Sequence, residues 1–121
     1  TIVACGPLVY QSLIAAKQLE EKGINVRVIN NHTIKPIDTL TLAKAAKETG
    51  AIVTVEEHQV NAGLGGAVAE SLAKNYPVPI EFIGMQDTFG ESGNTNELYE
   101  KYGMSPDAIF KAVENVLKRK K

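Results

Sequence analysis

Short apolar runs alternate with amphipathic helical patterns along the whole chain of 121 residues. We expect strands at four apolar runs, Thr1–Cys5, Ile24–Ile29, Ala51–Val55 and Ile80–Ile83, with a helix after each. Such alternation is typical of a mainly parallel sheet, because a parallel pair needs a long crossover that a helix supplies. The sequence therefore predicts an α/β fold, a three-layer α/β/α sandwich with a mainly parallel sheet.

Residues that favour helix ends mark where several of the helices begin. Pro7 suits the first position of a helix, where its missing N–H costs nothing, and Asp38 suits the N-cap of a helix that Gly50 would end. Ser105, which precedes a proline, indicates the start of the last helix. A short helix over 94–102 is expected before it, after a long loop. In the first helix, the stripe that we expect to face the sheet is Val9, Leu13, Ala16 and Leu19.

Charge and cysteine content exclude several classes of function. The formal net charge is -1, which argues against a general nucleic-acid or membrane-surface binder. Residues 48–100 are strongly acidic, which disfavours phosphate binding there. Cys5 is the single cysteine, so we expect no disulfide within the chain and no cysteine-based zinc site. This composition indicates a reducing, cytoplasmic setting.

The length of the chain predicts one domain over residues 1–121. The sequence has no initiator methionine, and its first residues read as the inside of a strand. We therefore expect this domain to be a piece of a longer protein.

The strongest candidate site follows the third predicted strand. There, carboxylates and an imidazole come directly before a glycine-rich helix start, in a predicted loop over residues 56–62. The candidate residues are Glu56, Glu57, His58, Gly63, Gly65 and Gly66. In a functional interpretation, His58 moves a proton and the helix N-terminus holds an anion. In the structural alternative, the glycines allow close packing and the charged residues line an interface.

Other motifs do not assemble into an active site. The glycine pattern fails the dinucleotide-binding fingerprint because Val68 stands where a glycine or alanine is needed. His32 and His58 lie on different predicted segments, so no metal site is predicted. Ser92 lacks the spacing of a nucleophile elbow. Adjacent carboxylates such as Glu56 and Glu57 should point to opposite sides of an extended backbone. We therefore predict no catalytic residue in this chain.

Several segments, taken in order, resemble the C-terminal domain of transketolase. They are similar above all to the C-terminal half of transketolases that are split into two chains. No single motif is specific, but the series covers essentially the whole chain. The segments are Thr1–Tyr10, Gly23–Asn30, Thr33–Asp38, Thr54–His58, Gly63–Gly66, Asp87–Gly93 and Leu98–Ser105.

The resemblance implies a specific role. Transketolases transfer a two-carbon ketol unit between sugar phosphates with thiamine diphosphate and a divalent metal, magnesium, which other domains bind. The resemblance therefore implies a non-catalytic domain that supports assembly of a dimeric enzyme and is inactive alone. Its partners would be the remaining transketolase domains or an N-terminal subunit, with no nucleic acid and no membrane. It also implies an antiparallel edge strand before Thr1, so we expect an uncovered sheet edge.

Two alternatives remain open from the sequence. One is the equivalent domain of 1-deoxyxylulose-5-phosphate synthase or of a 2-oxoacid dehydrogenase beta subunit, which resemble this domain type. The other is a stand-alone anion- or nucleotide-binding module that uses the helix start at Gly63.

Overall fold

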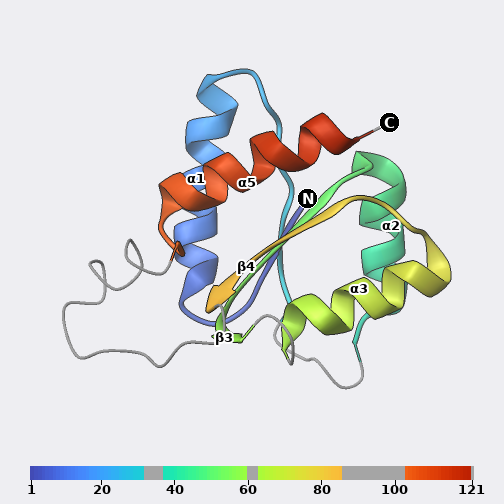
Figure 1. Ribbon diagram of the computed structural model, residues 1–121. Coiled ribbons are helices and arrows are strands. Elements are labelled where there is room, and N and C mark those ends of the chain that lie inside the picture. Colours follow the sequence, from blue (N-terminus) through green and yellow to red (C-terminus); the bar gives the residue numbers. More distant parts are fainter. Residues whose placement is uncertain (32–36, 60–62, 86–102, 121) are drawn as a thin grey trace.

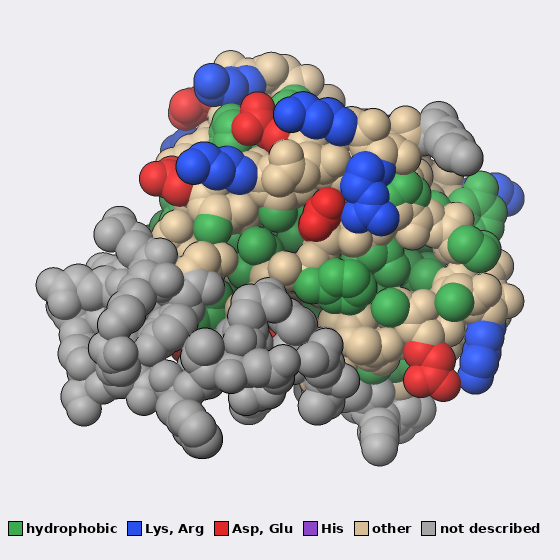
Figure 2. All heavy atoms as spheres, viewed as in Figure 1, with side chains coloured by type: hydrophobic (Ala, Val, Ile, Leu, Met, Phe, Trp, Pro, Cys, Tyr) green, Lys and Arg blue, Asp and Glu red, His purple; other side chains and the backbone are tan. Residues whose placement is uncertain are grey.

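Four parallel strands form one sheet in the order β2-β1-β3-β4. The computed structural model describes residues 1–31, 37–59, 63–85 and 103–120. Its strands are β1 (Ile2–Ala4), β2 (Val28–Asn30), β3 (Ile52–Gln59) and β4 (Ile80–Met85). Among the described residues, β2 and β4 each pair with one neighbour. Exposed apolar side chains lie across the middle of the face in view, where β4 runs (Figures 1 and 2).

Helices cover both faces of this sheet. The helices are α1 (Leu8–Glu21), α2 (Thr39–Thr49), α3 (Leu64–Asn75) and α5 (Pro106–Arg119). Side chains of α1 and α5 share one apolar cluster with the sheet, and those of α2 and α3 share the other. Figure 1 shows the two pairs on opposite sides of the strands. The prediction of a three-layer α/β/α sandwich is therefore confirmed, and the sheet is parallel throughout its described strands.

The central strand β3 serves both layers through its alternating side chains. Val53 and Val55 belong to the cluster beneath α1 and α5, whereas Ile52 belongs to the cluster beneath α2 and α3. All three side chains are buried. Because successive side chains of a strand point to opposite faces, Thr54 and Glu56 follow Ile52 toward α3. This alternation decides where the candidate site residues lie.

The predicted core stripe of α1 is confirmed for Leu19 and for Val9, which packs against the core, but it is wrong for Leu13. The helix buries Leu8, Ser12, Ala15 and Leu19, while Leu13 is 52% exposed. A serine can replace an apolar residue here because the Ser12 hydroxyl donates to the Leu8 carbonyl oxygen, 2.8 Å away. The helix carries apolar residues on more than one side, so helical spacing alone did not select the face that meets the sheet. Part of its apolar surface is therefore left outside the core.

The other predicted boundaries agree with the structure to different degrees. The predicted N-cap at Asp38 is confirmed, as is a left-handed glycine, Gly50, at the end of α2. Ser105 caps α5 by accepting a hydrogen bond from the amide of Ala108, at 3.3 Å. Strand β2 is shorter than predicted. His32, the loop with Ser92 and the helix predicted over 94–102 lie outside the described residues.

The N-cap of α2 makes stability depend on pH. The Asp38 carboxylate accepts from the hydroxyl of Thr41 at 2.7 Å and from its amide at 3.1 Å. These bonds hold the pKa of Asp38 below the usual value of an aspartate, and the bond from the hydroxyl has the larger effect. The cap therefore stabilises the fold fully above the unfolded pKa, and this contribution is lost as pH falls through the lowered folded value. We expect Asp38→Asn to reduce the loss of unfolding free energy at acidic pH, measured by urea titrations at several pH values. An unchanged dependence of the unfolding free energy on acidic pH would contradict this role of Asp38.

Candidate functional site

The candidate residues do not lie in a loop as predicted. Strand β3 continues to Gln59, so Glu56, Glu57 and His58 belong to the strand itself. The strand extends beyond the apolar residues that predicted it, because Glu56, although charged, is buried under the start of α3. The segment 60–62 lies outside the described residues, and of the His58 side chain nothing is described. The structure therefore brings Glu56 together with Gly63 and Gly65, and proton transfer by His58 stays a prediction.

The carboxylate of Glu56 is the central feature of this site. Its side chain has no exposed surface. Its two oxygens accept hydrogen bonds from the amides of Leu64, at 2.7 Å, and Gly65, at 2.5 Å. These amides belong to the first turn of α3, where helical N–H groups have no partner within the helix and the helix dipole favours negative charge. The helix start does hold an anion, but the anion is a side chain of the same chain.

Two glycines make room for this arrangement. A Cβ atom at Gly63 would lie 1.9 Å from the Glu56 Oε1 atom and 2.9 Å from its Cδ atom. A Cβ atom at Gly65 would lie 2.8 Å from the Phe82 ring and 3.0 Å from the Thr54 hydroxyl. Real Cβ atoms do not approach this closely, so any side chain at either position would displace a neighbour. For these two residues, the interpretation as packing glycines fits the structure. Gly66 lies in the same helix and is partly exposed.

Sequence reasoning missed two residues that help to build this site. Thr54 is fully buried, and its hydroxyl has no hydrogen-bond partner among the described residues. Phe82 on β4 packs against Gly65 although the residue is 38% exposed. The period-two pattern of β3 could have placed Thr54 on the same face as Glu56, but no local signal pairs Phe82 with α3.

The carboxyl edge of the sheet is electrostatically negative near β1 and β3. Cys5 follows β1, and its amide donates to the Val55 carbonyl oxygen at 3.3 Å. Burial raises the pKa of the Cys5 thiol, and the charges of Glu56 and then Glu57 raise it further. The thiol is therefore kept protonated, which does not suit a nucleophile, because the thiolate is the reactive form. Cys5 packs instead against the apolar cluster under α2 and α3.

The described residues at this edge do not fit a diphosphate or its metal. The two α3 amides that could receive a phosphate oxygen already receive Glu56. A second carboxylate, Glu57, stands near Cys5 at the same edge, so the local negative charge would repel a diphosphate. Within the described ranges, no three His, Cys, Asp or Glu side chains come together as a metal site would require.

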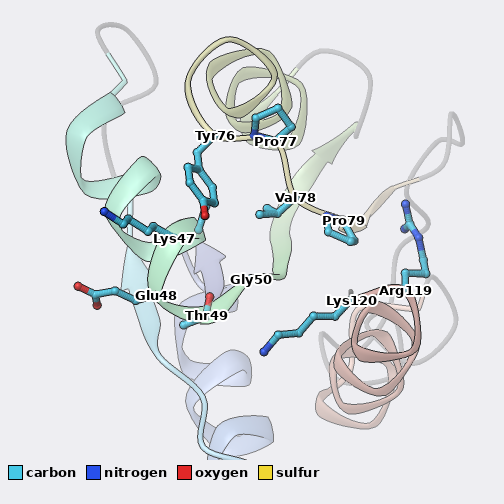
Figure 3. Close-up of a pocket in the computed structure, with 11 residues that line it drawn as sticks. Lys47, Glu48, Thr49, Gly50, Tyr76, Pro77, Val78, Pro79, Arg119 and Lys120 are labelled. Atoms are coloured by element: carbon cyan, nitrogen blue, oxygen red, sulfur yellow. The ribbon is translucent and has the colours of Figure 1, made fainter.

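A groove lies at the other end of the sheet, away from the carboxyl edge that holds Glu56. It has a volume of about 710 Å³ and is lined by the end of α2, the Tyr76–Pro79 linker and the end of α5. Figure 3 shows the Lys120 side chain reaching across it toward Glu48 and Thr49, while the Lys47 side chain points outward. The residues from α2 and from the linker directly precede β3 and β4, so the groove lies at the amino ends of these strands, whereas ligands in parallel sheets usually bind at the carboxyl ends. The groove is therefore separate from the candidate site.

Comparison with known protein families decides the identity of the fold. Residues 1–109 match the family described as "Transketolase, C-terminal domain". The chain belongs to this family. The resemblance inferred from the sequence motifs is thus confirmed, and the described carboxyl edge with its buried Glu56 is part of a transketolase C-terminal domain.

Individual relatives agree with this membership. A 6-deoxy-6-sulfo-D-fructose transketolase subunit of Clostridium sp. (strain MSTE9) is 44% identical over 99% of the chain and 37% of its own length. An apulose-4-phosphate transketolase subunit of Phocaeicola vulgatus is 43% identical over 98% of the chain and 38% of its own length. A solved structure described as "Split gene transketolase, inactive beta4 tetramer" matches with a TM-score of 0.95 and 46% identity, over 99% of the chain and 39% of that structure.

These matches cover only part of each relative. The chain spans less than two fifths of the length of each of them. The first two of these relatives are named as subunits of transketolases. In the described part of the chain, no helix is both long and apolar enough to cross a membrane.

Proposed function

We propose that this chain is the C-terminal assembly domain of a split, thiamine diphosphate-dependent transketolase, and that it performs no chemistry itself. In this proposal, residues 1–121 are one domain of a larger cytoplasmic enzyme. A partner of the N-terminal type binds thiamine diphosphate and magnesium, which supply the ketol-transfer chemistry. The named transketolase subunits among the relatives support the choice of enzyme.

One observation carries the non-catalytic part of the proposal. The anion position at the start of α3, which a phosphorylated ligand would need, is taken by the buried Glu56 carboxylate. The same observation disfavours a stand-alone anion- or nucleotide-binding module. In our proposal, Glu56 is a positioning residue that fixes the start of α3 and thereby the Gly63–Gly66 segment. That segment, with Glu57 and His58, would meet the partner of the N-terminal type.

A self-assembling state is part of the same proposal. The solved relative is described as an inactive beta4 tetramer, so a subunit of this kind can associate with its own copies when it is not active. We propose that this chain also associates with itself, within the homodimeric holoenzyme that the resemblance implies.

A reconstitution assay tests the proposed function. The chain would be assayed alone, with a candidate N-terminal transketolase subunit encoded beside it, and as a mixture, for ketol transfer from a ketose phosphate. We expect transfer in the mixture and none with the chain alone, because the described residues do not fit the cofactor. Transfer by the chain alone would contradict the proposal. Use of a 2-oxoacid in place of the ketose donor would instead favour the alternative, a 1-deoxyxylulose-5-phosphate synthase or a 2-oxoacid dehydrogenase.

A further inference from the structure

The outer side of α1 carries apolar side chains that nothing in the described structure covers. Tyr10 is 67% exposed and Leu13 is 52% exposed, although both lie on a helix that packs against the sheet. The core takes the other side of the helix, through Leu8 and Leu19. Isolated exposed apolar residues are ordinary, but these two lie one turn apart on the same side of one helix. They form a small apolar ridge.

A hollow lies directly beside this ridge. It has a volume of about 510 Å³ and is lined by Leu13, Ala16, Lys17, Glu20, Asn25 and Val26. Leu13 belongs both to the ridge and to the wall of the hollow. A projecting aromatic side chain, Tyr10, and a concave site thus lie on the same helix. A projecting side chain and a hollow on one surface can make that surface self-complementary, as a two-fold symmetric contact between two copies requires.

The spacing along α1 fits such a contact. Tyr10 and Lys17 are seven residues apart, which is about 10 Å along a helix. If two copies of α1 cross antiparallel with the two-fold axis close to Leu13, Tyr10 of one copy meets the hollow near Lys17 of the other. The two Leu13 side chains then face each other at the centre.

The charges around the hollow suit the same contact. Neither Lys17 nor Glu20 makes a side-chain hydrogen bond or ion pair with any other residue of the described structure. An ammonium group near the face of a tyrosine ring is attracted to it, so Lys17 favours the insertion of Tyr10. The Tyr10 hydroxyl can also donate to a carboxylate such as Glu20. An unrelated partner would have to supply this complementary pattern independently, whereas a second copy carries it by construction.

We propose that the surface formed by Tyr10, Leu13, Ala16, Lys17, Glu20 and Val26 binds the same surface of a second copy of this chain. This inference rests on the self-association in the proposed function and assigns its location. Leu13 lies on the two-fold axis, and Tyr10 is the aromatic anchor that fills the partner's hollow.

Sedimentation velocity over a range of concentrations, with the chain in the absence of any N-terminal subunit, tests the proposal. We expect Leu13→Glu to raise the dissociation constant of the dimer at least about tenfold, because it places two carboxylates against each other at the centre. We expect Tyr10→Ala to weaken the dimer by a similar factor. Leu40→Glu is the matched control, because Leu40 is 85% exposed on α2, on the opposite face of the sheet. Circular dichroism would verify that each variant is folded.

A second measurement places the two-fold axis. In a Cys5→Ser background, Leu13→Cys should form a disulfide-linked dimer under mild oxidation, and Leu40→Cys should not. A wild-type chain that remains monomeric, a dimer that Leu13→Glu leaves unchanged, or equal cross-linking at both positions would overturn the proposal. Because no activity is measured, failure here is distinct from failure of the ketol-transfer assay.

Discussion

Replacing Glu56 with glutamine should lower the free energy of unfolding by about 2 to 4 kcal/mol, since buried hydrogen bonds to a charged group are among the strongest in proteins. The carboxylate accepts from two amides of α3, those of Leu64 and Gly65. A glutamine side chain has nearly the same volume but offers one acceptor oxygen. Its NH₂ group would face one of the two N–H groups, so one buried amide would lose its partner.

Urea or guanidinium unfolding, monitored by circular dichroism, would measure this effect. Glu70→Gln is the control, because Glu70 sits on the exposed side of the same helix in a surface pair with Lys74. We expect that control to change stability by less than about 0.5 kcal/mol. If both variants had equally small effects, the Glu56 carboxylate would not anchor α3. A loss of partner binding in Glu56→Gln, at temperatures where it stays folded, would further support its role as a positioning residue.

Adding a single methyl group at Gly63 should be nearly as costly, at about 2 to 3 kcal/mol, through the clash and the displaced hydrogen bonds. The new Cβ atom would lie 1.9 Å from a Glu56 carboxylate oxygen, so either the side chain or the backbone must move. Moving the carboxylate breaks its bonds to the α3 amides. The φ angle of Gly63 is -117°, outside the left-handed region that favours glycine, so the clash with the Glu56 carboxylate is the contact that a methyl group adds here.

A double-mutant cycle separates this clash from a general backbone effect. In a Glu56→Ala background, the oxygen that collides with the new methyl group is gone, so Gly63→Ala should cost clearly less than it does in the wild type. Unfolding curves of the wild type, both single variants and the double variant would give the coupling energy. If Gly63→Ala were equally destabilising in both backgrounds, the clash with Glu56 would not be its cause.

The fold class could be predicted from the sequence because its signals are local. Apolar runs of strand length, separated by segments of helical periodicity, require parallel pairing with helical crossovers. The cap at Asp38 and the helix end at Gly50 were also readable, since each depends on the chemistry of one or two neighbouring residues. The ordered series of motifs was sufficient to indicate the family that the comparison then established.

Other features could not be predicted because their determinants are distant in sequence. The face of α1 that meets the sheet depended on the layer beneath it, so Leu13 was assigned to the core and lies outside it. The extension of β3 through Glu56 depended on a charged residue finding its partners eight and nine residues later in α3. Sequence periodicity reports polarity, and by polarity alone a glutamate ends an apolar strand.

The sequence by itself determined the alternation of elements, the layered parallel sheet and the presence of a glycine-rich helix start beside two carboxylates. Tertiary structure alone decided what that helix start does. Free helical amides attract whichever anion reaches them, a ligand or a side chain, and the sequence contains no measure of which is closer. In the folded chain, Glu56 is buried against the amides of Leu64 and Gly65, so a side chain of the protein itself occupies the anion position of this helix.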